Sequence, residues 1–129
     1  MIITGKGFRV VLKDSLRLIP GSLRSLCKAF DVPTSKGVFP HAFITPKTLE
    51  YVGACPDREY FKSGEDALSS AEYTSLPPVY DVRRQAIDYN RRDCIALYEI
   101  ITLFQTMVFD LFKVNALSFN TIASLAYGC

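Results

Sequence analysis

A chain of 129 residues is long enough for one modest domain and gives no support for two. Its hydrophobic fraction of 49% with 22% charged residues is typical of a globular protein and excludes an intrinsically disordered one. Fifteen basic against 13 acidic side chains give a net charge of +2, so charge alone does not indicate nucleic-acid binding.

The cysteines are widely spaced, form no C-x-x-C pair and are accompanied by a single histidine, His41. We therefore expect reduced thiols and no structural zinc site. The N-terminus shows neither a secretory signal nor an Arg-rich transit peptide. The apolar stretch 95–108 is interrupted by Glu99 and Gln105, and we expect it to be too short to cross a bilayer. The chain is therefore predicted to be soluble, with no membrane partner.

The first predicted element is a hairpin, with strands at 2–4 and 8–12 around a glycine turn. Two short strands do not make an independently stable sheet, so we expect further strands outside this chain. Ser22 follows a Pro-Gly pair and precedes apolar residues at helical spacing, which predicts a capped helix ending near Asp31.

Prolines and glycines then interrupt residues 33–78 repeatedly, which predicts mostly loop with helical turns at 47–52 and 64–76. Asp81 can cap a long helix that reaches Phe112. Ser118 offers the cap of a last short helix. We expect the long helix to direct these apolar residues inward: Ile87, Cys94, Leu97, Tyr98, Ile101, Phe104, Val108 and Leu111.

Tyr89 and Asp93 are four residues apart on the long helix, so a phenol and a carboxylate share one face. In two-metal phosphodiester hydrolysis a carboxylate binds a divalent ion while a hydroxyl can orient the attacking water. The spacing by itself is common in helices. Arginines on the same helix have a plain alternative as a solvated face: Arg83, Arg84, Arg91 and Arg92. Aromatic residues of the irregular segment can stack on unpaired bases or simply form core: Phe39, Phe43, Tyr51, Tyr60 and Phe61.

Five short segments, in order, make the chain resemble the family B DNA polymerases of the protein-primed, organellar and viral kind. They are a D-S…P-x-S-L…L…F segment, a K-x-x-F-P element, a Y-x-G…P element, the third exonuclease motif and a T-x-x-S-L-A stretch. These fall respectively at residues 13–30, 36–40, 51–56, 89–98 and 121–126. The order of the five, more than any one of them, carries the resemblance.

The resemblance implies an α/β fold, the ribonuclease H-like 3′–5′ exonuclease domain. This chain would be its later, helix-rich part and mostly α on its own. Residues 1–113 would end the exonuclease domain, and residues 114–129 would begin the connection to the polymerase domain.

Site roles also follow from the resemblance. Asp93 would be a metal ligand for Mg²⁺ or Mn²⁺, Tyr89 would position the water, and Lys36 would lie near the scissile phosphate. Phe39, Arg91 and Arg92 would contact DNA. The partners would be a single-stranded 3′ end, a template–primer and a terminal-protein primer. The location would be mitochondrial, on a linear plasmid.

The family's other exonuclease acids would lie before Met1, and its polymerase motifs would lie after Cys129. One carboxylate does not hold Mg²⁺ tightly against water, so we expect this chain alone to be inactive and to bind no metal tightly. Asp14 is better explained as a structural turn than as a second ligand, and His41 is not needed as a base. Two alternatives remain, a non-catalytic module that binds single-stranded nucleic acid and a decayed gene remnant.

Overall fold

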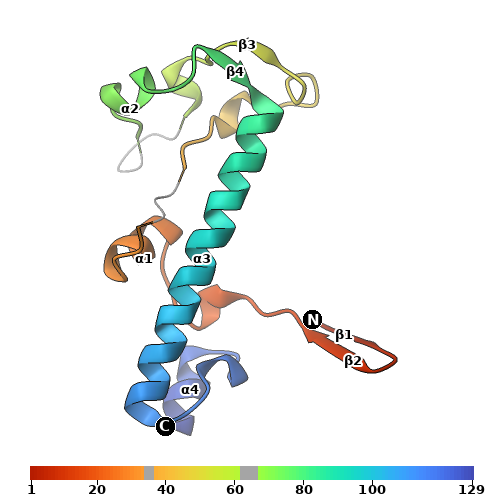
Figure 1. The fold of residues 1–129 in the computed structure, drawn as a ribbon, viewed down its shortest axis with the longest axis vertical. Helices are drawn as coiled ribbons and strands as arrows, with labels where there is room; N and C mark the ends of the chain where they lie inside the picture. Colours follow the sequence, from red (N-terminus) through yellow and green to blue (C-terminus); the bar gives the residue numbers. More distant parts are fainter. Residues whose placement is uncertain (34–36, 62–66) are drawn as a thin grey trace. The chain divides into compact units, whose positions relative to one another are not determined.

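The computed structural model describes residues 1–33, 37–61 and 67–129, and it is mixed α/β, with helices and two small sheets (Figure 1). The chain divides into two compact units. The first contains Met1–Pro33 and Leu97–Cys129, and the second contains Thr34–Ala96. One long helix, α3 (Val82–Phe112), contributes residues to both.

The predicted hairpin is confirmed as β1 (Ile2–Gly5) paired antiparallel with β2 (Phe8–Val11). Gly7 has φ of 81°, the left-handed conformation that a glycine adopts without the cost of a Cβ clash. All residues of both strands are exposed, and no third strand joins them among the described residues. The hairpin therefore lacks the packed face that a stable sheet requires.

Helix α1 (Leu23–Ala29) begins as predicted, because the Ser22 hydroxyl accepts a hydrogen bond from the Ser25 backbone N–H at 3.2 Å. Asp31 follows it with φ of 51°, a conformation that ends the helical path.

Helix α4 (Ile122–Gly128) is also present, but Thr121 caps it. The prediction of Ser118 as the cap was wrong, because Ser118 lies in a short 3-10 turn, Ala116–Ser118. Thr121 accepts from the Ser124 N–H at 3.0 Å, and Ser124 accepts in return from the Thr121 N–H.

The predicted long helix is confirmed as α3, and an Asp81 carboxylate oxygen accepts from the Arg84 N–H at 3.0 Å. The prediction of which apolar residues of α3 point inward was only partly right. Phe104 and Val108 are buried, whereas Ile87, Tyr98 and Leu111 are more than 60% exposed. The buried residues of α3, which we call the buried stripe, are Val82, Ala96, Ile100, Phe104 and Val108.

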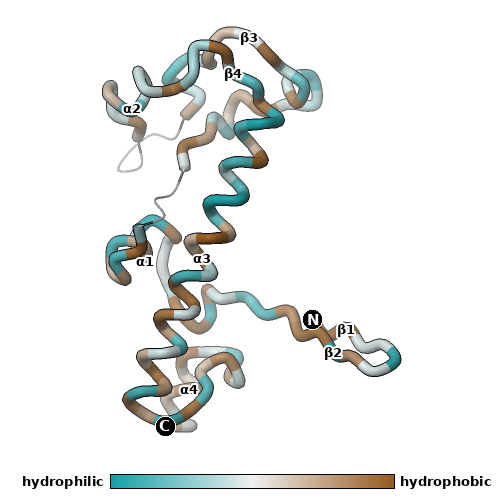
Figure 2. The backbone as a smooth tube through the Cα atoms, viewed as in Figure 1, coloured by the Kyte–Doolittle hydropathy of each residue, from teal (hydrophilic) through white to brown (hydrophobic). Residues whose placement is uncertain are grey.

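In the first unit, α3 supplies part of the core together with Leu18, Ile19, Cys27 and Val32. The C-terminal segment is held to the N-terminal one by the Lys13 ammonium, which donates to the Leu117 carbonyl at 2.6 Å. Figure 2 shows that apolar residues recur along the later half of α3.

In the second unit, β3 (Val52–Ala54) pairs antiparallel with β4 (Val79–Asp81), in the register Gly53↔Tyr80. This sheet was not predicted, and Val52, expected in a helical turn, lies in a strand instead. The expected turn at 64–76 is partly right, since α2 (Ser70–Thr74) forms there, while residues 62–66 lie outside the described residues. Phe43 packs edge-on against Tyr51 and Tyr60, as expected for core packing of the irregular segment.

The expectation that the apolar stretch is too short for a bilayer does not hold for α3. Over its 31 residues it includes an 18-residue window of mean hydropathy 1.6, long and apolar enough to cross a membrane. The core helix of a soluble protein meets the same criteria, so length and composition do not decide between the two.

Candidate functional site

Tyr89 and Asp93 lie in the second unit, one turn apart on α3, where they continue the spacing of the buried stripe back from Ala96. Both are half-buried. The Tyr89 hydroxyl is near enough to the Asp93 carboxylate for the two groups to interact. The phenol and the carboxylate therefore share one face of α3, as predicted.

The electrostatics of the pair hold the phenol in its neutral form. Burial raises the pKa of Tyr89 most, and the negative charge of Asp93 and the hydrogen bond to it raise that pKa further. Tyr89 is therefore a hydrogen-bond donor, and not a phenolate, at neutral pH.

One Asp93 oxygen has no partner among the residues that the structure describes. It is the Oδ1 atom, which is buried. A buried carboxylate oxygen without a partner is costly in a dry site, and a cation is a suitable partner for it. Among the described residues, however, no group of three or more His, Cys, Asp or Glu forms a possible metal site. Asp93 therefore fits as one ligand of a divalent ion and does not complete a site.

Two rings from residues 37–43 pack on Tyr89. The centroids of Phe39 and His41 each lie 5.4 Å from that of Tyr89, and the Phe39 and His41 centroids are 5.2 Å apart. We call Phe39, His41 and Tyr89 the aromatic cluster. Gly37 lies against the same tyrosine, since a Cβ added to it would come 3.2 Å from Tyr89 Cδ2.

The other predicted site residues are distributed differently. Lys36 lies outside the described residues. Arg91 and Arg92 are both exposed, and within the described ranges neither has a carboxylate partner. Asp14 accepts from the Leu16 N–H at 3.0 Å in the first unit, which agrees with a structural turn.

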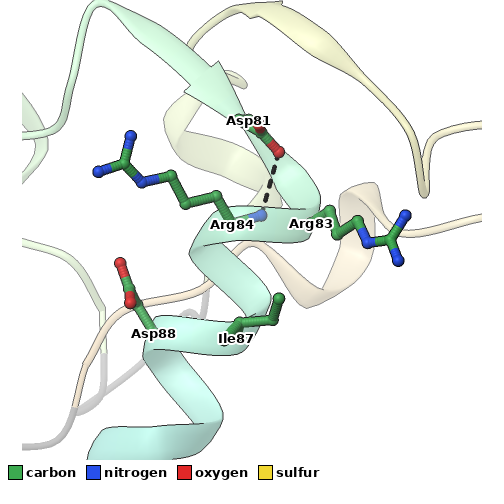
Figure 3. A pocket seen from close by; sticks show the side chains of 5 residues that line it. All are labelled: Asp81, Arg83, Arg84, Ile87 and Asp88. Atoms are coloured by element: carbon green, nitrogen blue, oxygen red, sulfur yellow. Dashed lines mark hydrogen bonds between the residues drawn. The ribbon is translucent and has the colours of Figure 1, made fainter.

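A shallow pocket of about 230 Å³ lies at the start of α3, lined by Asp81, Arg83, Arg84, Ile87 and Asp88 (Figure 3). The two guanidinium groups point to opposite sides of the helix, and two carboxylates offset their charge. Arg83 lies 3.5 Å from Glu50, but both side chains are mostly exposed, so the pair contributes little. These side chains do not converge on one ligand.

Sequence reasoning did not associate His41 and Gly37 with Tyr89. The K-x-x-F-P element marked the segment, but its spacing gave no distance to a helix some fifty residues later.

Comparison with known proteins places the chain among DNA polymerases. The family described as "DNA polymerase type B, organellar and viral" matches residues 1–129, and the chain belongs to this family. The resemblance to organellar and viral family B polymerases, inferred from the five sequence segments, is thereby confirmed.

Three relatives, each named "Probable DNA polymerase", support the assignment. The protein from Podospora anserina is 35% identical over 92% of this chain and 10% of its own length. The protein from Agaricus bitorquis is 32% identical over 90% of this chain and 15% of its own length. The protein from Neurospora intermedia is 31% identical over 93% of this chain and 13% of its own length. The chain thus spans only about a tenth to a seventh of these relatives, and no solved structure matches it.

Proposed function

We propose that this chain is the part of a type B DNA polymerase that carries the Tyr89–Asp93 pair of its 3′–5′ proofreading exonuclease. The observation that carries the proposal is the buried Asp93 Oδ1, which has no hydrogen-bond partner among the described residues, beside a neutral phenol that interacts with the same carboxylate. Family membership over residues 1–129 gives the context that the i, i+4 spacing lacks by itself. In this proposal the chain is the later part of a ribonuclease H-like domain.

Each residue has a distinct role. Asp93 is one ligand of a Mg²⁺ or Mn²⁺ ion, and the remaining ligands come from elsewhere in the polymerase. The bound ion would stabilise charge on the phosphate oxygens. Tyr89 orients the attacking water through its hydroxyl, and Lys36 offsets charge on the departing oxygen.

The proposed partner is DNA, as a single-stranded 3′ end and a template–primer, with a terminal-protein primer and a mitochondrial location. A membrane is not proposed. Residues 95–112 contain Glu99 and Asp110, and acidic side chains are rare and costly in membrane-spanning segments.

The isolated 129-residue chain should be inactive, because Asp93 alone does not hold Mg²⁺ against its hydration shell. The measurement is digestion of a 3′-labelled single strand with Mg²⁺ and with Mn²⁺. Digestion by the wild-type chain that disappears in Asp93→Ala would contradict this expectation.

In a polymerase that contains this chain, Asp93→Ala should lower exonuclease activity by at least about the 10- to 100-fold that weakening a metal site costs. Primer extension should stay near wild type. Asp88→Ala is the matched control, because it removes an exposed aspartate of the same helix and should spare both activities. Equal loss of both activities in Asp93→Ala would refute the assigned role.

A second candidate function is a non-catalytic module that binds single strands, favoured by the exposed Arg91 and Arg92. The isolated chain would then bind single-stranded DNA with a strong salt dependence, because phosphate contacts release counterions. Arg91→Ala with Arg92→Ala would reduce both the affinity and the salt slope. Absence of binding at low salt would exclude this function.

A further inference from the structure

The aromatic cluster surrounds a side chain whose proposed role depends on its exact position. Tyr89 is attached to α3, but its ring contacts come from residues 37–41, which are distant in sequence. Phe39 meets the tyrosine ring at an interplanar angle of 30°, and His41 meets it edge-on at 81°. The two rings also contact each other edge-on, at 80°. Each ring of the cluster therefore contacts the other two.

Gly37 allows this segment to approach the tyrosine closely. A Cβ at residue 37 would come 3.2 Å from Tyr89 Cδ2 and 3.8 Å from Tyr89 Cα. The first distance is closer than ordinary van der Waals contact, so even an alanine would press on the tyrosine ring. The Phe39 and His41 rings and the closely packed Gly37 together leave little freedom for the Tyr89 ring to turn.

We propose that Gly37, Phe39 and His41 are positioning residues, which hold the Tyr89 ring so that its hydroxyl stays beside the Asp93 carboxylate. The inference rests on the proposed function of Tyr89. Phe39 acts through Tyr89 in this arrangement, and not by stacking on a DNA base. The reason is geometric, because a group that orients a water works only within a narrow range of position, which neighbouring side chains have to fix.

A matched control lies in the same unit. Phe43 is half-buried like Phe39, and its ring lies 5.0 Å from Tyr51 and 5.2 Å from Tyr60. Phe39→Leu and Phe43→Leu therefore remove the same ring from comparable surroundings, but only the first removes a contact of Tyr89.

The first experiment is NMR on the 129-residue chain with labelled tyrosine rings. The chain has seven tyrosines, and the Tyr89 signals are those missing from Tyr89→Phe. Phe39→Leu should shift the Tyr89 ring signals through loss of the Phe39 ring current. Phe43→Leu should shift the Tyr51 and Tyr60 signals instead.

Tyr89 signals that are unchanged by Phe39→Leu would overturn the proposal. Should Phe39→Leu fail to fold, which loss of signal dispersion reveals, His41→Ala serves in its place. His41 is exposed, so its truncation leaves the core intact, and it should still move the Tyr89 signals. Unmoved Tyr89 signals in a folded His41→Ala chain would equally overturn the proposal.

The second experiment uses a polymerase that contains the chain. Phe39→Leu should lower the exonuclease kcat by about 10-fold, because small displacements of a positioned group cost one to two orders of magnitude. The KM for single-stranded DNA should not change. A raised KM with unchanged kcat would instead indicate base stacking by Phe39 and refute the proposal. In a Tyr89→Phe background, Phe39→Leu should cause no further loss of kcat.

Together the two experiments distinguish failure of the proposed function of Tyr89 from failure of the positioning role of Phe39. If Tyr89→Phe leaves the exonuclease unchanged while Phe39→Leu moves the Tyr89 signals, the proposed function of Tyr89 fails and the packing stands. If Tyr89→Phe lowers kcat but Phe39→Leu does not, the proposed function stands and the positioning role fails.

Discussion

Replacing Tyr80 by phenylalanine should stabilise the protein, although most substitutions in a core destabilise it. Tyr80 lies in β4 with 0% of its surface exposed, and within the described part of the chain its hydroxyl oxygen has no hydrogen-bond partner. A buried polar group without a partner costs about 1–3 kcal/mol. The void left by one oxygen costs about 1 kcal/mol or less. We therefore expect Tyr80→Phe to gain roughly 1 kcal/mol at pH 7.

The Tyr80 hydroxyl should also make the stability of the wild-type protein fall at high pH. Burial, and after it the charge of Cys55, raises the pKa of Tyr80 to about 12 in the folded state. Folding therefore disfavours the phenolate, and this effect leaves the free energy of unfolding unchanged below the ordinary tyrosine pKa of about 10. As pH rises from about 10 toward about 12, the free energy of unfolding falls, and the difference in pKa corresponds to a loss of roughly 3 kcal/mol.

The assay is urea unfolding followed by far-UV circular dichroism, at pH 7 and at pH 11, for wild type and Tyr80→Phe. The advantage of the variant should grow with pH, because the two proteins differ only in the Tyr80 hydroxyl. Tyr73→Phe is the control, since the Tyr73 hydroxyl donates to the Pro56 carbonyl at 3.0 Å and its loss should destabilise. A Tyr80→Phe protein that is less stable than wild type at pH 7 would show that the hydroxyl has a partner, and would refute the reasoning.

Two further predictions concern α3, both measured by thermal or urea unfolding. Asp81→Ala should cost about 1 kcal/mol of stability, because it removes the N-cap hydrogen bond to the Arg84 N–H. The control Asp88→Ala should change stability little. Equal losses in the two variants would show that Asp81 does not stabilise the helix as its N-cap. Ile100→Ala should cost about 2–5 kcal/mol, because Ile100 is 0% exposed, whereas Leu111→Ala, at a residue 68% exposed, should stay within about 0.5 kcal/mol. A larger loss of stability in Leu111→Ala than in Ile100→Ala would contradict the assignment of the buried stripe.

Short-range features of this chain could be read from its sequence. Ser22 and Asp81 were recognised as helix caps, because a cap joins a side chain to a backbone N–H only three residues away. The i, i+4 relation of Tyr89 and Asp93 follows from helix geometry alone. The cap of α4 was misassigned because Ser118 and Thr121 are both good caps by residue type, and the 3-10 turn at Ala116–Ser118 decides between them.

The face that α3 buries depends on tertiary packing. Its later half is apolar nearly all the way round, as Ile95, Leu103, Met107 and Phe109 also show, so periodicity does not single out one stripe. Burial of Ile100 and exposure of Leu111 are set by which neighbours pack against the helix. The pairing of β3 with β4 is similarly undetermined by local pattern, because the two strands are separated by more than twenty residues.

The sequence by itself determined the family, the helix that carries Tyr89 and Asp93, and the closeness of those two side chains, because each depends on residue order or on spacing within one helix. Only the tertiary structure decided what surrounds them. Phe39 and His41 reach Tyr89 through a fold in the chain that brings together residues some fifty positions apart, and no local pattern encodes that distance. The burial that raises the pKa of Tyr89 is for the same reason a property of the folded chain.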